Sequence, residues 1–173
     1  VAKLFDVLGY KNSASAAKNV VDFEKQLANY LLTLEQNRDA NLRYNPKNVS
    51  ELSGLVKNVN LAKYLKDAGV NTDKVIVGEL KYYQNMDQFF NQKNLPLLKD
   101  YLKYHVINGN ASNLGDNLDN IRFDFYSKYL QGQKEQRAMD KRGLALVNSV
   151  LGEAFGKLYV DEHFSPESKK QME

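Results

Sequence analysis

The chain has 173 residues, of which 43% are hydrophobic and 26% are charged, and this balance predicts a folded domain and excludes a disordered chain. Its 24 basic and 21 acidic side chains give a formal net charge of only +3, and no basic cluster is interleaved with aromatic residues, so we expect no nucleic-acid partner. Cysteine is absent, which excludes disulfides and thiolate metal sites.

The first elements in chain order are predicted to be helices. Residues 1–9 have the pattern of the last turns of a helix that Gly9 ends. Ser13 or Ser15 is a candidate cap for a second helix, which we expect to end near Asn37. Its apolar stripe has the three- and four-residue spacing of one helix face: Val20, Phe23, Leu27, Leu31 and Leu34.

The middle of the chain is predicted to consist of short elements. Asn45-Pro46 indicates a turn, and short helices are expected over residues 49–56 and 61–68. Asn60 is a candidate cap for the second of these, and Gly69 is placed to end it. The apolar run of residues 75–77 is predicted to be an extended connector, because it is too short to support a sheet alone.

Four further helices are predicted after residue 80. They cover residues 82–91, a stretch capped by Asn94 with Pro96 in its first turn, a stretch from Ser112 to Gly132, and a long helix over residues 134–162. Ser165-Pro166-Glu167 has the pattern of a new helix start. The sequence therefore predicts an all-α, multi-helix fold with short connectors and at most a trace of β, forming one helical domain over residues 1–173.

Side chains that could carry catalysis are few. His105 falls on an apolar helical stripe and is predicted to be a hydrogen-bonded core or boundary residue, and His163 is predicted to stabilise a helix C-terminus. No His-Glu-x-x-His motif and no glycine-rich phosphate loop occurs. The carboxylates are interpreted as solvated helix faces, and the tyrosines beside lysines as core edges, with a ligand groove as the alternative. We therefore predict no catalytic, cofactor-binding or metal-binding residue in this chain.

Two glycines lie four residues apart on the long helix, Gly152 and Gly156. Each costs about 1 kcal/mol relative to alanine in a helix interior. The cost is tolerated where another backbone approaches closely, and Ala145 and Ser149 roughly extend the small strip. We therefore expect this helix to lie tightly against neighbours and to be central to the fold.

Several segments resemble the N-terminal helical region of neprilysin-like zinc metallopeptidases of the bacterial endopeptidase O type. The clearest match is LGEAFGKLYV with the following HFSPE, over residues 151–160 and 163–167. Weaker matches follow family order: residues 21–28, 44–46, 98–102, 123–126 and 130–132. One departure is Ala138-Met139-Asp140, where family members often have Pro-Arg-Trp before the Lys-Arg pair.

The resemblance implies that this chain is a fragment of a larger metalloendopeptidase that hydrolyses oligopeptides. It implies a zinc ion in the parent protein, held by residues C-terminal to this chain, and a helical lobe that covers the catalytic lobe and encloses the substrate chamber. The implied partners are the C-terminal catalytic lobe and peptide substrates. No apolar run reaches the roughly 18 residues of a membrane span, and we expect no membrane segment in this chain.

Two alternatives stay open. The chain could instead be a stand-alone, non-enzymatic helical interaction module. The lack of cysteine fits a reducing compartment, so the cytoplasm is the expected location, with an extracellular or membrane-anchored ectoenzyme as the alternative.

Overall fold

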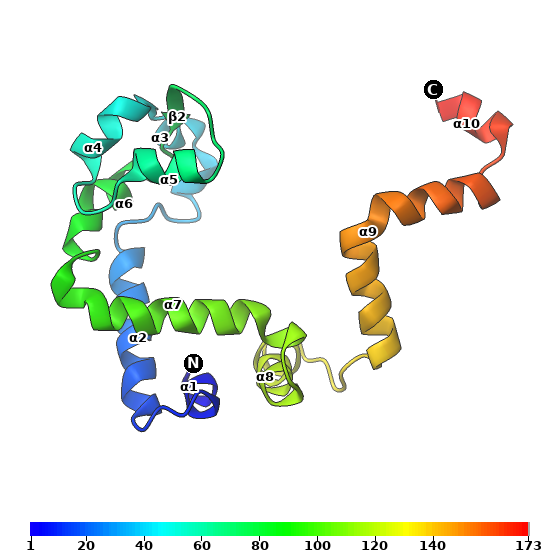
Figure 1. Cartoon of the computed structure of the whole chain (residues 1–173), viewed down its shortest axis with the longest axis horizontal. Helices are drawn as coiled ribbons and strands as arrows, with labels where there is room; N and C mark the ends of the chain where they lie inside the picture. The colour runs from blue at the N-terminus through cyan, green and yellow to red at the C-terminus, as the bar shows by residue number, and fades with distance from the viewer. Residues whose placement is uncertain (173) are drawn as a thin grey trace. The chain divides into compact units, whose positions relative to one another are not determined.

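The structure is a computed structural model that describes residues 1–172 of the chain (Figure 1). It is an all-α fold with a trace of β, as the sequence predicts. The chain divides into two compact units, residues 1–122 and 123–173. The predicted single helical domain over residues 1–173 stays a prediction.

The core of the first unit is built on α2 (Ser13–Ala28). One cluster on this helix joins Phe23 and Leu27 to Phe89 and to Leu98 of α7 (Leu95–Asn110), which crosses α2 in Figure 1. A second cluster joins Val20 to Phe5 of α1 (Ala2–Val7). Val20, Phe23 and Leu27 recur at helical spacing, so one face of α2 is buried as its stripe predicts.

The end of α2 differs from the prediction. The helix stops at Ala28 rather than near Asn37, and Leu34 at the end of the expected stripe is 89% exposed. Polar side chains give the backbone other partners here: the Glu79 carboxylate accepts a hydrogen bond from Leu32 N (2.9 Å), and Asn37 Nδ2 donates to Leu32 O (3.1 Å). Such bonds compete with the helical ladder and end it early.

The start of α2 also differs from the prediction. Asn12 occupies the N-cap position, and neither predicted serine caps the helix. The Ser13 hydroxyl instead donates to the carboxylate of Asp6, so it ties the end of α1 to the start of α2.

A group of short elements follows α2 in the chain. They are a 3₁₀ turn (Gln36–Arg38), α3 (Ala40–Arg43), β1 (Pro46–Asn48), a 3₁₀ turn (Val49–Glu51), α4 (Leu52–Leu55), α5 (Leu61–Asp67) and β2 (Lys74–Ile76). Next come α6 (Leu80–Asn85) and two 3₁₀ turns (Met86–Gln88 and Gln92–Asn94), which lead into α7. Most of these elements are a single turn or two, so tertiary contacts rather than helix propensity hold them.

The run at residues 75–77 is not a simple connector. Residues 74–76 form β2, which pairs antiparallel with β1 so that Lys47 lies opposite Val75. Asn45 fastens this ribbon at its end: its Nδ2 donates to Val77 O (3.0 Å), and Val77 N donates to Asn45 O (3.0 Å). The two strands lie far apart in the sequence, and pairing between distant segments leaves no local signal. The sequence therefore did not predict the pairing of β1 with β2.

The first unit ends with α7, a 3₁₀ turn (Ala111–Asn113) and α8 (Asp116–Arg122). Pro96 lies in the first turn of α7 as predicted, and Asn94 is its N-cap residue, although the Asn94 side chain makes no cap hydrogen bond to the helix. Ser112 lies in the 3₁₀ turn and does not begin the next helix. Gly9 and Gly69 have the left-handed φ of 76° that favours glycine where a helix ends.

The second unit contains a π-helical stretch (Phe123–Tyr129), α9 (Met139–His163) and α10 (Pro166–Met172). The long helix begins later than the predicted residue 134 and bends at Leu151, whose φ of −117° and ψ of 22° are not helical (Figure 1). The start of α10 is as predicted, because Ser165 Oγ accepts a hydrogen bond from Ser168 N (3.2 Å).

Candidate functional site

The two histidines lie in ordinary structural positions. His105 Nε2 on α7 is 2.9 Å from Glu24 Oε1 on α2, and its ring packs edge-on against Tyr101, with ring centroids 4.4 Å apart. The predicted hydrogen bond of His105 is confirmed, but the prediction of a core or boundary position is not, because the side chain is 46% exposed. His163 is the last residue of α9, and its ring centroid lies 4.9 Å from that of Tyr159.

A zinc centre needs three or four protein ligands that converge on one point. In residues 1–172, no three side chains of His, Cys, Asp or Glu come together in a way that could hold a metal ion. The pair of His105 and Glu24 offers only two donors. The described residues therefore form no zinc centre of their own, and the zinc ion that the resemblance places C-terminal to this chain, like the lack of a catalytic residue here, stays a prediction.

One carboxylate of the first unit, that of Asp87, accepts hydrogen bonds from backbone N–H groups. Asp87 Oδ1 accepts hydrogen bonds from Lys57 N (3.1 Å) and Asn58 N (2.8 Å), and these two donors hold the pKa of the Asp87 carboxyl below its ordinary value. The interpretation of the carboxylates as solvated is wrong for Asp119, which is 7% exposed and belongs to α8, a helix that contacts α1. These two carboxylates therefore belong to the packing of the fold.

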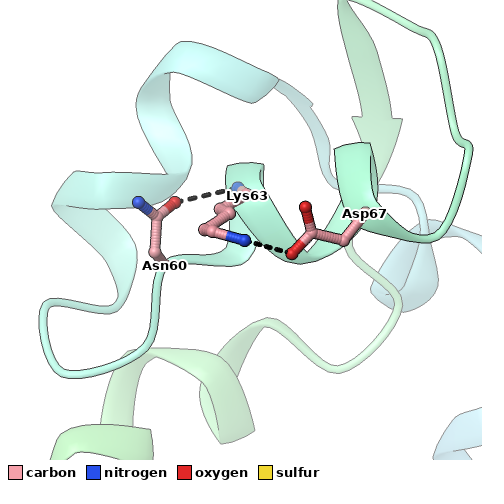
Figure 2. A network of polar contacts seen from close by, with 3 residues as sticks. All are labelled: Asn60, Lys63 and Asp67. Carbon is pink, nitrogen blue, oxygen red and sulfur yellow. Dashed lines mark hydrogen bonds and ion pairs between the residues drawn. The ribbon is translucent and has the colours of Figure 1, made fainter.

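The polar network in Figure 2 also has a structural role. Asn60 Oδ1 accepts a hydrogen bond from Lys63 N (2.9 Å), which confirms the predicted cap of α5, and Lys63 pairs with Asp67 one turn further on. Both charged side chains are more than half exposed. Such a solvated pair contributes about 0.3–0.5 kcal/mol, so the network stabilises α5 locally and offers no binding chemistry.

The first unit contains an apolar cavity. It measures about 270 Å³ and lies among α4, α5, β2 and α6. Its walls combine aliphatic side chains with two tyrosines, and they include Leu52, Leu55, Leu61, Leu65, Tyr64 and Tyr83. None of the described residues that line it is charged, so the cavity is suited to holding an apolar group.

The sequence alone did not predict this cavity. The leucine pairs at spacings of three and four in two successive short helices were the available signal, together with alternate valines at residues 75 and 77. Only the pairing of β2 with β1 brings the valine run to the two helices. Of the tyrosines predicted at core edges, Tyr101 packs on the α2 cluster as expected, whereas Tyr64 lines the cavity.

Within the second unit, helix α9 is exposed along most of its length. All residues of α9 are described, and none of them is buried. Its exposed apolar side chains include Leu144, Val150, Leu151, Phe155, Leu158 and Tyr159. A Cβ atom added to Gly152 or Gly156 would meet no described atom within 4 Å. No residue of the second unit packs on these glycines, and the expectation that α9 lies tightly against neighbours and is central to the fold stays a prediction.

Two further findings bear on the sequence predictions. Within residues 1–172, no helix combines the length and the apolar character needed to cross a bilayer.

The family model for peptidase family M13, N-terminal region, matches residues 1–173, which is the whole chain.

Relatives with known names agree with this match. A neutral endopeptidase of Lactococcus lactis is 27% identical over 99% of this chain, and neprilysin-11 of Caenorhabditis elegans is 24% identical over 89% of it. The chain spans 27% and 19% of the length of these two relatives.

Solved structures agree as well. The fold matches the zinc metalloprotease Zmp1 of Mycobacterium tuberculosis in its open state with a TM-score of 0.87, at 26% identity over 99% of this chain and 27% of that one. An inhibitor complex of the same protein matches with a TM-score of 0.84 at 24% identity, a likeness in fold alone. The family match over the full length of the sequence shows that this chain belongs to peptidase family M13.

Proposed function

We propose that this chain is a helical segment of a zinc-dependent metalloendopeptidase that hydrolyses oligopeptides, and that it encloses and gates the substrate chamber without supplying a catalytic residue. The catalytic zinc would be held by a C-terminal lobe of the same polypeptide. That lobe and the peptide substrates would be its partners.

The observation that carries this proposal is the likeness to Zmp1 in its open state over 99% of the chain. That protein is a zinc metalloprotease, and this chain corresponds to only about a quarter of it. The described residues support the division of labour, because they supply apolar surfaces and a cavity but no set of three metal donors. A wall around a chamber selects substrates by size and keeps bulk water from the reaction.

The test compares the isolated 173-residue chain with the full-length protein that contains it. Both are incubated with zinc and with fluorogenic peptides of increasing length, and a folded protein that contains the same cleavable sequence is the size control. We expect the full-length protein to cleave the short peptides and to spare the folded protein, while the isolated chain cleaves neither. Zinc-dependent cleavage by the isolated chain would overturn the assignment.

The location of the protein is a separate proposal. The absence of cysteine from this chain supports the cytoplasm, where thiols stay reduced and disulfides are rare. Fractionation of the native cells, with detection by an antibody against this chain, tests it. Recovery of the protein outside the cell or in the membrane fraction would favour the ectoenzyme alternative.

A further inference from the structure

The half of α9 that follows the bend presents chemically distinct faces. Glu153, Lys157 and Asp161 recur every four residues and so form one charged face. Leu151, Phe155 and Leu158 follow the spacing of a second, apolar face, on which Leu158 is 64% exposed. An apolar face of this kind is buried in a folded protein unless it binds something, because its exposure to water is unfavourable.

A third face is made of small residues. Gly152 and Gly156 lie one turn apart, beside the apolar face and away from Lys157. Neither glycine is required by its backbone, because only Gly9, Gly69 and Gly132 have a positive φ among the described residues. In an exposed helix these glycines only destabilise, whereas a flat face without Cβ atoms lets a second helix approach closely.

We propose that the apolar and glycine faces of α9 are an internal docking surface for a helix of the same polypeptide that lies beyond residue 173. The proposal rests on the proposed function, in which this chain is one segment of a larger peptidase. The length of the relatives supports this occupant: the chain spans only 27% of the neutral endopeptidase that it matches, so most of such a protein is still to be placed against it.

The charges on α9 argue against a membrane as the occupant. Helices that lie on membranes carry Lys and Arg on their polar face. The polar face of this half of α9 holds one lysine against Glu153 and Asp161, and Glu162, four residues after Leu158, ends the apolar face. A face with excess acid is repelled by anionic lipids, whereas it suits the solvent-facing side of a helix packed inside a protein.

The lack of cysteine in this chain allows a site-specific test in the full-length protein. Leu158→Cys and Lys157→Cys are made separately, and the rate of thiol labelling at each new cysteine is followed by peptide mass spectrometry under native conditions. We expect Cys at position 158 to react at least about tenfold more slowly than Cys at position 157, because docking excludes the reagent. Equal labelling of the two would overturn the proposal.

A second pair of variants tests the glycine face. Gly156→Leu and Lys157→Leu add the same side chain at adjacent positions of the helix. We expect Gly156→Leu to lower the thermal midpoint of the full-length protein by several degrees, and Lys157→Leu to leave it nearly unchanged. A Gly156→Leu protein at least as stable as the control would contradict close packing there.

Two outcomes separate this proposal from others. Protection of position 158 that is lost on dilution to the monomer would identify a second copy as the occupant and would overturn the proposal. Slow thiol labelling at position 158 in a monomer that has no peptidase activity would support the docking surface. The same result would contradict the proposed function. Both measurements are independent of catalysis.

Discussion

The aromatic centre of the first unit gives the sharpest stability prediction. Phe23 on α2 is 2% exposed, and its ring meets those of Phe89 and Tyr101 edge-on, with centroids 5.9 Å and 5.2 Å away. Truncating a buried phenylalanine to alanine costs about 3–5 kcal/mol, because it removes apolar burial and leaves a cavity. That loss is a large share of the roughly 5–15 kcal/mol that stabilises a typical domain.

The assay is urea unfolding of the 173-residue chain, monitored by far-ultraviolet circular dichroism. We expect Phe23→Ala to lower the free energy of unfolding by about 4 kcal/mol. Phe23→Leu retains most of the apolar volume and loses the two aromatic pairs, so a loss of about 1–3 kcal/mol is expected. Leu34→Ala is the control, because Leu34 is 89% exposed. A Phe23→Ala protein as stable as the Leu34→Ala control would refute the described core.

Two further predictions concern polar contacts of the first unit. Asn60→Ala removes the cap of α5 and should lower the free energy of unfolding by about 1 kcal/mol. Lys63→Ala breaks only an exposed ion pair and should change the free energy of unfolding by less than about 0.5 kcal/mol. Equal losses of the two variants in urea titrations would contradict the cap. Asp87→Ala should lower the urea midpoint at pH 7. Because the pKa of Asp87 is lower in the folded protein than its ordinary 3.8, its contribution is present above that pH and is lost as the pH falls through the folded value, so the two midpoints should converge in acid. A gap that widened toward acid would show that the carboxylate is not the stabilising form.

The predictions that succeeded depend on signals within one turn of the chain. The cap at Asn60, the left-handed glycine at residue 69 and the serine before Pro166 each act on the nearest backbone groups, so the sequence contains the whole cause. The all-α class follows from the repeated three- and four-residue spacing. The motif at residues 151–160 indicated the family before any fold was known.

The predictions that failed depend on groups distant in sequence. The stripe on α2 continued to Leu34, but the hydrogen bonds that Leu32 makes with Glu79 and Asn37 end the helix, and Glu79 lies far along the chain. The pairing of β1 with β2 and the cavity beside it arise from the same kind of long-range contact. The glycines of α9 indicate close packing in general, and no packing partner for them lies within the second unit.

The central claim is that this chain forms part of the enclosure while other residues of the polypeptide hold the metal. Its most direct test is the zinc content of the purified full-length protein and of its variant with both His105→Ala and His163→Ala, measured by elemental mass spectrometry after dialysis. We expect the same zinc content in both proteins, because neither histidine lies in a set of three donors among the described residues. Loss of zinc from the double variant would contradict the account.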